Sequence, residues 1–193
     1  MKKIFSTVCA IILAFTMSNA QAPAIKKGTQ LTYHVTTSDK SYDYVITVKE
    51  YSPSISFDWK MTDPVNTSGK ITIALNALQK ATSYKNYFQD GSNEALTTQS
   101  TVWLSKKNFN ELKSSGKTSM NMTGDLNTYE KVAAPQQVSY NAKGVTKTAN
   151  VIGCQFVKTA DTNYTVRVFD DAKDPLIQYM DLGSFTITLK SVE

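Results

Sequence analysis

The chain has 193 residues, and its 21 lysines and arginines against 16 aspartates and glutamates give a formal net charge of +5. Almost all of the positive charge is lysine, because Arg167 is the only arginine, and the lysines are scattered singly or in short pairs. Proteins that read nucleic acid rely on arginine for bidentate contacts. We therefore expect no nucleic-acid partner and interpret the lysines as a solvated surface.

The first 22 residues have the three-part pattern of a secretory signal peptide. "MKK" precedes an apolar run over residues 4–17, and the small residues of "SNAQA" follow. The run is shorter than the ~20 residues that a membrane-spanning helix needs. Ala20, Gln21 and Ala22 fit an Ala-x-Ala cleavage site, and cleavage after Ala20 is the alternative.

This pattern sets the expected domain organisation and location. We predict a signal peptide over residues 1–22 and a single β-rich exported domain over residues 23–193, in the periplasm or outside the cell. We expect no transmembrane segment after cleavage, because no other stretch is apolar enough.

Alternation of apolar and polar residues predicts three consecutive strands at the start of the domain. "QLTYHVTT", "YDYVITV" and "ISFDWKM" each place apolar or aromatic residues on one face. In the third run, Phe57 and Trp59 share the apolar face and Asp58 lies on the other. The short connections "SDKS" and "EYSP" favour an antiparallel meander.

Two short helices interrupt the strands. Helical spacing of apolar residues predicts the first over residues 75–84. "SKKNFNELKSSG" predicts the second, because Ser105 is suited to cap it, Phe109 and Leu112 lie three apart, and Gly116 follows the last turn.

Further alternating runs fill the rest of the chain, giving roughly nine to eleven strands in all. The last run places Phe185, Ile187 and Leu189 on one face, and the turn at Gly183 predicts a hairpin with the preceding "PLIQYM". We expect the sheet to end where the chain ends. The predicted fold is mainly β: a single strongly curved antiparallel sheet or half-barrel with two short helices.

The sequence offers little for catalysis. His34 is the only histidine and lies on the polar face of the first strand run. Cys154 is the only cysteine after residue 22, and its apolar neighbours favour burial. A zinc site needs three or four ligands, and no nucleophile motif precedes a helix. We therefore predict no enzyme, no catalytic residue, no metal site and no cofactor.

The acidic group "DDAKD", with Asp170, Asp171 and Asp174, does not follow the spacing of a calcium loop. We interpret these aspartates as turn residues, whose side chains bond the local backbone. A weak cation site is the alternative.

Inward-facing aromatic and methionine side chains are the positive feature. They indicate either a filled core or a cavity for an acyl chain, a sugar or a peptide. The candidate ligand-binding residues are Tyr44, Phe57, Trp59, Trp103, Met120 and Met122.

"KKGTQLTYHV", "VWLSKKNFNELK" and "DPLIQYMDLGSFTITLK" resemble an exported bacterial family of Bacteroidetes type that is described only as a domain of unknown function. The resemblance covers about residues 25–193. It implies a fold distantly similar to the curved half-barrels of periplasmic lipoprotein carriers, and it implies no catalytic residues.

These observations predict an exported, non-catalytic protein that binds an apolar or amphipathic ligand of the cell envelope in a curved-sheet cavity. Possible partners are a lipid, a glycan or an envelope protein, and we expect a monomer. The alternative is an interaction or scaffold protein that uses a sheet face or edge and has no small-molecule ligand.

Overall fold

A computed structural model describes residues 20–134, 136–159 and 162–193. The predicted signal peptide therefore lies outside the described residues up to position 19. Among the described residues, no helix is long and apolar enough to cross a membrane.

The alternating runs of the sequence form strands, and the two helically spaced segments form helices. The elements in chain order are β1 (Gln30–Thr37), β2 (Ser41–Tyr51), β3 (Ile55–Met61), β4 (Ser68–Ile73), α1 (Leu75–Lys80), β5 (Ser83–Tyr84), β6 (Asn93–Leu96), β7 (Gln99–Ser100), α2 (Lys106–Ser114), β8 (Lys117–Asn121), β9 (Leu126–Lys131), β10 (Gln136–Ala142), β11 (Val145–Thr159), β12 (Thr162–Phe169), β13 (Ile177–Asp181) and β14 (Phe185–Val192).

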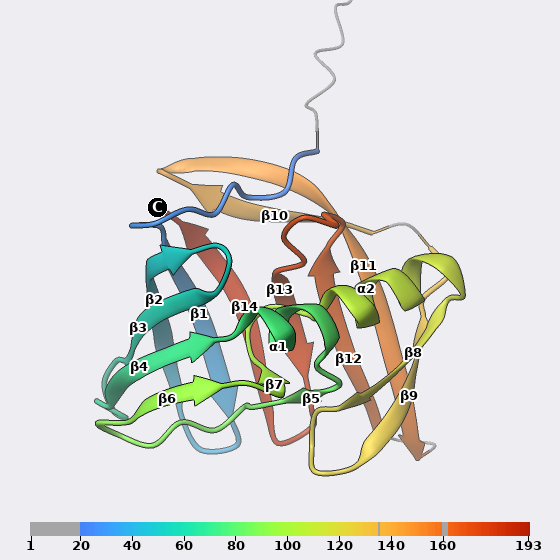
Figure 1. Cartoon of the computed structure of the whole chain (residues 1–193), viewed down its shortest axis with the longest axis horizontal. Coiled ribbons are helices and arrows are strands. Elements are labelled where there is room, and N and C mark those ends of the chain that lie inside the picture. Colours follow the sequence, from blue (N-terminus) through green and yellow to red (C-terminus); the bar gives the residue numbers. More distant parts are fainter. Residues whose placement is uncertain (1–19, 135, 160–161) are drawn as a thin grey trace, which may run out of the picture.

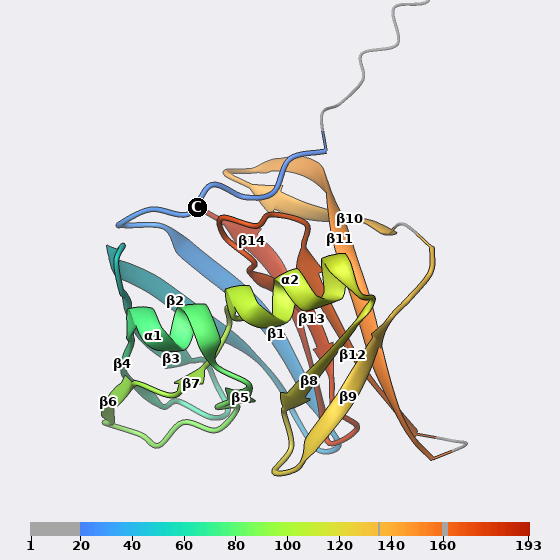
Figure 2. The same ribbon diagram turned by 45° about the vertical axis from the view of Figure 1, so that its right-hand side comes forward.

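All strands of the described residues belong to one curved sheet, in the order β6-β4-β3-β2-β1-β14-β13-β12-β11-β9-β8-β5-β7, with β10 beside β11 and β14. Most neighbours are antiparallel. The sheet bends around α1 and α2, which lie on its concave side (Figures 1 and 2). The predicted class, a mainly β half-barrel with two short helices, is confirmed.

The last strand lies in the middle of the sheet. β14 pairs with β1 on one side and with β13 on the other, so that Ile187 faces both Val35 and Met180. The predicted hairpin with β13 is confirmed, and Gly183 in its turn has a φ of +79°. The expectation that the sheet ends with the chain is wrong, because β1 continues it beyond β14.

The second helix follows its predicted signals closely. Ser105 caps α2 by accepting a hydrogen bond at Oγ from the backbone N of Asn108, 3.2 Å away. Gly116 follows the helix with a φ of +76°.

The first helix is shorter than the predicted 75–84. α1 ends at Lys80 because Ala81 takes an extended backbone, with ψ of 139°. Ser83 and Tyr84 then form β5 beside β7. The described residues hold fourteen strands rather than nine to eleven, since β5, β6 and β7 are only two to four residues long and carry no clear alternation.

Two groups of buried side chains make up the core. The first core cluster gathers residues of β1–β4 and α1, including Phe57 and Trp59. The second core cluster lies under α2 and includes Phe109 and Tyr129. Phe185 and residue 187 of β14 are half-buried and pack against both clusters.

Candidate functional site

Residues 101–104, here called the strap, run between two hollows on the concave side of the sheet. Val102 lines one hollow, and Trp103 and Leu104 line the other. The strap is fixed to the start of β13, because the backbone N of Ile177 donates to the Val102 carbonyl over 2.8 Å and the N of Leu104 donates to the carbonyl of Pro175 over 2.9 Å.

The backbone of the strap is strained at Val102, whose φ is +61°. A β-branched residue rarely adopts a positive φ, and the conformation costs roughly 1–3 kcal/mol. The surrounding hydrogen bonds hold it in place, including one of 2.7 Å from the buried Ser100 hydroxyl to the Trp103 carbonyl. Such strain persists only where the surrounding structure imposes it.

The first hollow, here called the aromatic cavity, has a volume of about 430 Å³. Its walls come from the concave faces of β1, β2 and β14, from the strap, and from the loop over residues 85–92. The lining residues are Tyr33, Val35, Thr37, Tyr42, Tyr44, Met61, Asn86, Tyr87, Phe88, Thr101, Val102, Ile177, Ser184, Phe185 and Ile187. None of them is an acidic or basic residue, so the walls are largely apolar with a few neutral polar groups.

Two tyrosines rise from the sheet into this cavity. Tyr33 and Tyr44 face each other across β1 and β2, with ring centroids 6.4 Å apart. The hydroxyl of Tyr33 donates to the Ile177 carbonyl over 2.7 Å. The hydroxyl of Tyr44 is buried and has no hydrogen-bond partner. Burial raises the pKa of both tyrosines well above the ordinary value, so both hydroxyls stay protonated and neutral.

The loop over residues 85–92 covers one side of the cavity. Phe88 stacks on Tyr44 with ring centroids 5.5 Å apart and an angle of 12°. The side-chain amide of Asn86 donates to the Met122 carbonyl over 2.7 Å, which ties the loop to the end of β8. Tyr87 at the rim is 78% exposed, an unusual position for a large aromatic side chain.

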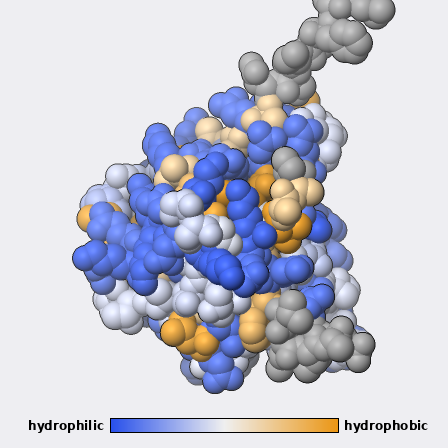
Figure 3. All heavy atoms as spheres, turned by 90° about the vertical axis from the view of Figure 1, so that its right-hand side faces the viewer, coloured by the Kyte–Doolittle hydropathy of each residue, from blue (hydrophilic) through white to orange (hydrophobic). Residues whose placement is uncertain are grey.

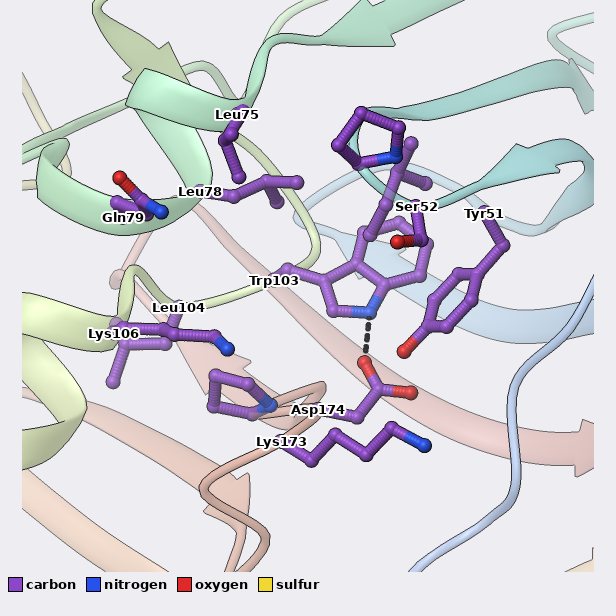
Figure 4. A pocket seen from close by; sticks show the side chains of 13 residues that line it. Tyr51, Ser52, Leu75, Leu78, Gln79, Trp103, Leu104, Lys106, Lys173 and Asp174 are labelled. Carbon is purple, nitrogen blue, oxygen red and sulfur yellow. Dashed lines mark hydrogen bonds between the residues drawn. The ribbon is translucent and has the colours of Figure 1, made fainter.

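The second hollow, here called the Asp174 pocket, has a volume of about 250 Å³ (Figure 4). Leu75 and Leu78 of α1 form an apolar wall, and Trp103 points across it to the carboxyl group of Asp174. The Trp103 Nε1 donates a hydrogen bond to Asp174 Oδ1 over 2.7 Å. The hydroxyl of Tyr51 points toward the same carboxyl group (Figure 4).

Asp174 is only 6% exposed, although it carries an ionisable group. Burial raises its pKa to about 6, while the hydrogen bonds from Tyr51 and Trp103 act in the opposite direction. The lining contains one carboxyl group, two lysines and no histidine or cysteine. Among the described residues, no group of three or more His, Cys, Asp or Glu side chains could hold a metal ion.

The six candidate ligand-binding residues are all buried, but they lie in different places. Tyr44 lines the aromatic cavity and Trp103 lines the Asp174 pocket. Phe57 and Trp59 pack inside the first core cluster, where Phe57 lies 5.9 Å from Trp103 and Trp59 lies 6.3 Å from Tyr44. The two methionines at 120 and 122 belong to the second core cluster.

The sequence pattern does not identify several residues of the hollows. Phe88 and Tyr87 lie in an irregular loop, which carries no period that would assign them a face. The sequence predicts that the Asp174 side chain bonds the local backbone of a turn, whereas the structure buries it against Trp103. Asp171 is a turn residue as predicted, because its Oδ1 accepts from the backbone N of Lys173 over 2.8 Å.

The neighbours of His34 and Cys154 show that neither side chain is set up for catalysis. His34 is partly exposed and its Nδ1 lies 3.0 Å from Asp43 Oδ1. Cys154 is fully buried in the second core cluster, as predicted, and burial raises its pKa to about 12. A thiol in that state is not a nucleophile at neutral pH.

Comparison of the chain with protein families and with curated proteins found no match to either.

Proposed function

We propose that this protein is an exported, non-catalytic binding protein that holds an apolar or amphipathic ligand of the cell envelope in the aromatic cavity. The observation that carries the proposal is a cavity of about 430 Å³ with an uncharged, mainly apolar and aromatic lining. Sites for small molecules have about 300–1,000 Å³ and the same kind of lining.

The structure of the walls also favours binding. The sheet supplies a rigid floor of inward side chains from adjacent strands, while the loop over residues 85–92 supplies Phe88 and the exposed Tyr87 at the rim. A rigid floor with an aromatic rim suits an elongated ligand that has one apolar part and one part near solvent.

The proposed location follows from the amino-acid pattern at the start of the chain. The charged start, short apolar run and Ala-x-Ala motif of residues 1–22 support export. An exported protein meets lipids and glycans of the envelope, and of these a lipid acyl chain fits an uncharged, aromatic cavity best.

The alternative scaffold role receives less support. The terminal strands of the sheet path, β6 and β7, have four and two residues, so they offer little backbone for pairing with another chain. The face made by the right-hand side of Figure 1 is mostly hydrophilic, with separate small hydrophobic areas over its described part (Figure 3). Neither feature resembles a broad docking surface.

The test uses the neutral, hydrophobic fluorophore N-phenylnaphthylamine and two variants of neighbouring residues on β14. Ile187→Trp fills the cavity, whereas Thr188→Trp adds the same ring on the opposite face of the strand. We expect the wild-type protein and Thr188→Trp to enhance the fluorescence and Ile187→Trp to lose most of the enhancement. Circular dichroism confirms that both variants are folded.

Two results would contradict the proposal. If a folded wild-type protein does not bind the fluorophore, the cavity is not a binding site and the scaffold role is favoured. If folded Ile187→Trp binds as well as wild type, the fluorophore reports another surface.

A further inference from the structure

We propose that the ligand is uncharged where it enters the aromatic cavity and carries a hydrogen-bond acceptor, such as the carbonyl of an acyl ester, that binds the Tyr44 hydroxyl. This inference rests on the proposed function and adds the chemical class of the ligand.

The unpaired hydroxyl of Tyr44 is the first observation. Tyr44 is 2% exposed, it lines the aromatic cavity, and its hydroxyl has no partner. Buried polar groups in proteins almost always have a hydrogen-bond partner, and an exception needs an explanation. The hydroxyl oxygen has almost no accessible surface, so a ligand acceptor supplies the missing partner once Phe88, which stacks on the Tyr44 ring, moves aside.

Three other polar groups of the cavity lining have partners within the protein. The Tyr33 hydroxyl donates to the Ile177 carbonyl, and the Asn86 amide donates to the Met122 carbonyl. The Thr37 hydroxyl lies 2.8 Å from Asp39 Oδ1. Among the described side-chain polar atoms that are buried without a partner, only the Tyr44 hydroxyl belongs to a residue of the cavity lining.

A second open donor lies in the same aromatic group. The Trp59 ring lies 6.3 Å from Tyr44 and 5.4 Å from Phe88, and its buried Nε1 also lacks a partner. An indole nitrogen can only donate. Both unpaired groups are therefore donors, but only Tyr44 belongs to the lining of the cavity, whereas Trp59 is a core residue.

The charge of the ligand follows from the cavity lining. An anion would need a lysine, an arginine or a charged histidine to replace its hydration, and a cation would need a carboxylate. The cavity lining contains neither kind of group. An ester or another neutral carbonyl compound loses less hydration than a carboxylate and still offers an acceptor to Tyr44.

The experiment measures displacement of N-phenylnaphthylamine by three compounds of similar length: methyl decanoate, dodecane and sodium decanoate at about pH 8. The variant Tyr44→Phe removes only the hydroxyl. The matched control is Tyr129→Phe, because the Tyr129 hydroxyl is also buried without a partner but belongs to the second core cluster.

We expect Tyr44→Phe to weaken the binding of methyl decanoate by about 3–10-fold, the value of one neutral hydrogen bond, and to leave the binding of dodecane unchanged. Tyr129→Phe should change the binding of neither compound. Sodium decanoate should bind wild type more weakly than methyl decanoate.

The possible failures are distinguishable. If none of the compounds displaces the fluorophore, both this inference and the proposed function are overturned. If the neutral compounds bind but Tyr44→Phe weakens the binding of methyl decanoate no more than the binding of dodecane, only the role of the hydroxyl is overturned. If sodium decanoate binds more tightly than methyl decanoate, the inference of a neutral ligand is overturned.

Discussion

The indole nitrogen of Trp103 donates a 2.7 Å hydrogen bond to the buried carboxyl group of Asp174, which lies 71 positions later in the chain. This bond joins the strap to the connection between β12 and β13. Since Val102 beside it lines the aromatic cavity and Trp103 lines the Asp174 pocket, the bond fixes the wall that the two hollows share.

Asp174→Asn tests the energetic cost of the buried carboxyl group. The pKa of Asp174 is about 6 in the folded protein against an ordinary 3.8, so the folded state holds the proton more tightly. Protonation of Asp174 therefore stabilises the folded state below about pH 4, and this stabilisation is lost as the pH rises through about 6. Asparagine keeps an acceptor for Trp103 and has no charge. We expect it to stabilise the protein on the order of 2–3 kcal/mol at about pH 8, with the difference vanishing below about pH 4.

Urea unfolding of wild type and Asp174→Asn across this pH range measures that difference directly. Asp125→Asn, at an exposed position, is the matched control and should show no difference of that size. A constant difference between wild type and Asp174→Asn at every pH would contradict the assignment of a raised pKa to this carboxyl group.

Trp103→Phe removes the donor and keeps an aromatic ring. The carboxyl group of Asp174 then stays buried with one hydrogen bond fewer, which raises its pKa further. We expect a loss of about 2–4 kcal/mol at about pH 8, from the smaller ring and the lost bond together. The loss should shrink in acid, where Asp174 is protonated. Equal destabilisation in acid and base would show that only ring volume matters.

Removal of β14 should unfold the domain. The strand lies between β1 and β13, so its loss breaks both ladders and removes Leu189, a core side chain that is only 2% exposed. Leu189→Ala is the milder change and should cost about 2–5 kcal/mol. Far-ultraviolet circular dichroism of a chain ending at Gly183 is the test, and a cooperative unfolding transition in that chain would refute the prediction.

Gly69→Ala should disturb the packing of Trp59. A Cβ at position 69 would lie 2.6 Å from the Ser92 carbonyl oxygen and 2.8 Å from Trp59 Cζ2. Relief of such contacts costs about 1–3 kcal/mol. The adjacent Ser68→Ala, at an exposed position, should stay within about 0.5 kcal/mol of wild type. Similar thermal denaturation midpoints for the two variants would argue against this packing.

Cys154 should not react with a maleimide in the folded protein. Its side chain is fully buried and burial raises its pKa to about 12. Labelling followed by mass spectrometry should show modification only after denaturant is added. Rapid labelling of the native protein would place the thiol at an accessible position.

Local features of the fold are predictable because they depend on local periodicity. Alternation identifies β1, β2 and β3, and the capping residue Ser105 with Gly116 identifies α2. The pairing of β14 with β1 depends on two segments at opposite ends of the chain, so no local pattern carries it. The early end of α1 depends on β5 pairing with β7, a tertiary contact that overrides helical spacing.

The candidate site is predictable only in part for a related reason. Alternation shows which side chains point inward, and all six candidates do so. It does not show whether the space in front of them is filled. Phe57 and Trp59 pack inside the core, whereas Tyr44 packs against Trp59 and Phe88 and also lines the cavity.

The central claim is that the aromatic cavity holds a ligand, and native mass spectrometry of the protein purified from its own cells tests it most directly. We predict a bound species of defined additional mass that is organic, uncharged and released by denaturation, and that is absent from folded Ile187→Trp purified in the same way. A wild-type protein with only the mass of its polypeptide, or an additional mass that Ile187→Trp retains, would contradict the account.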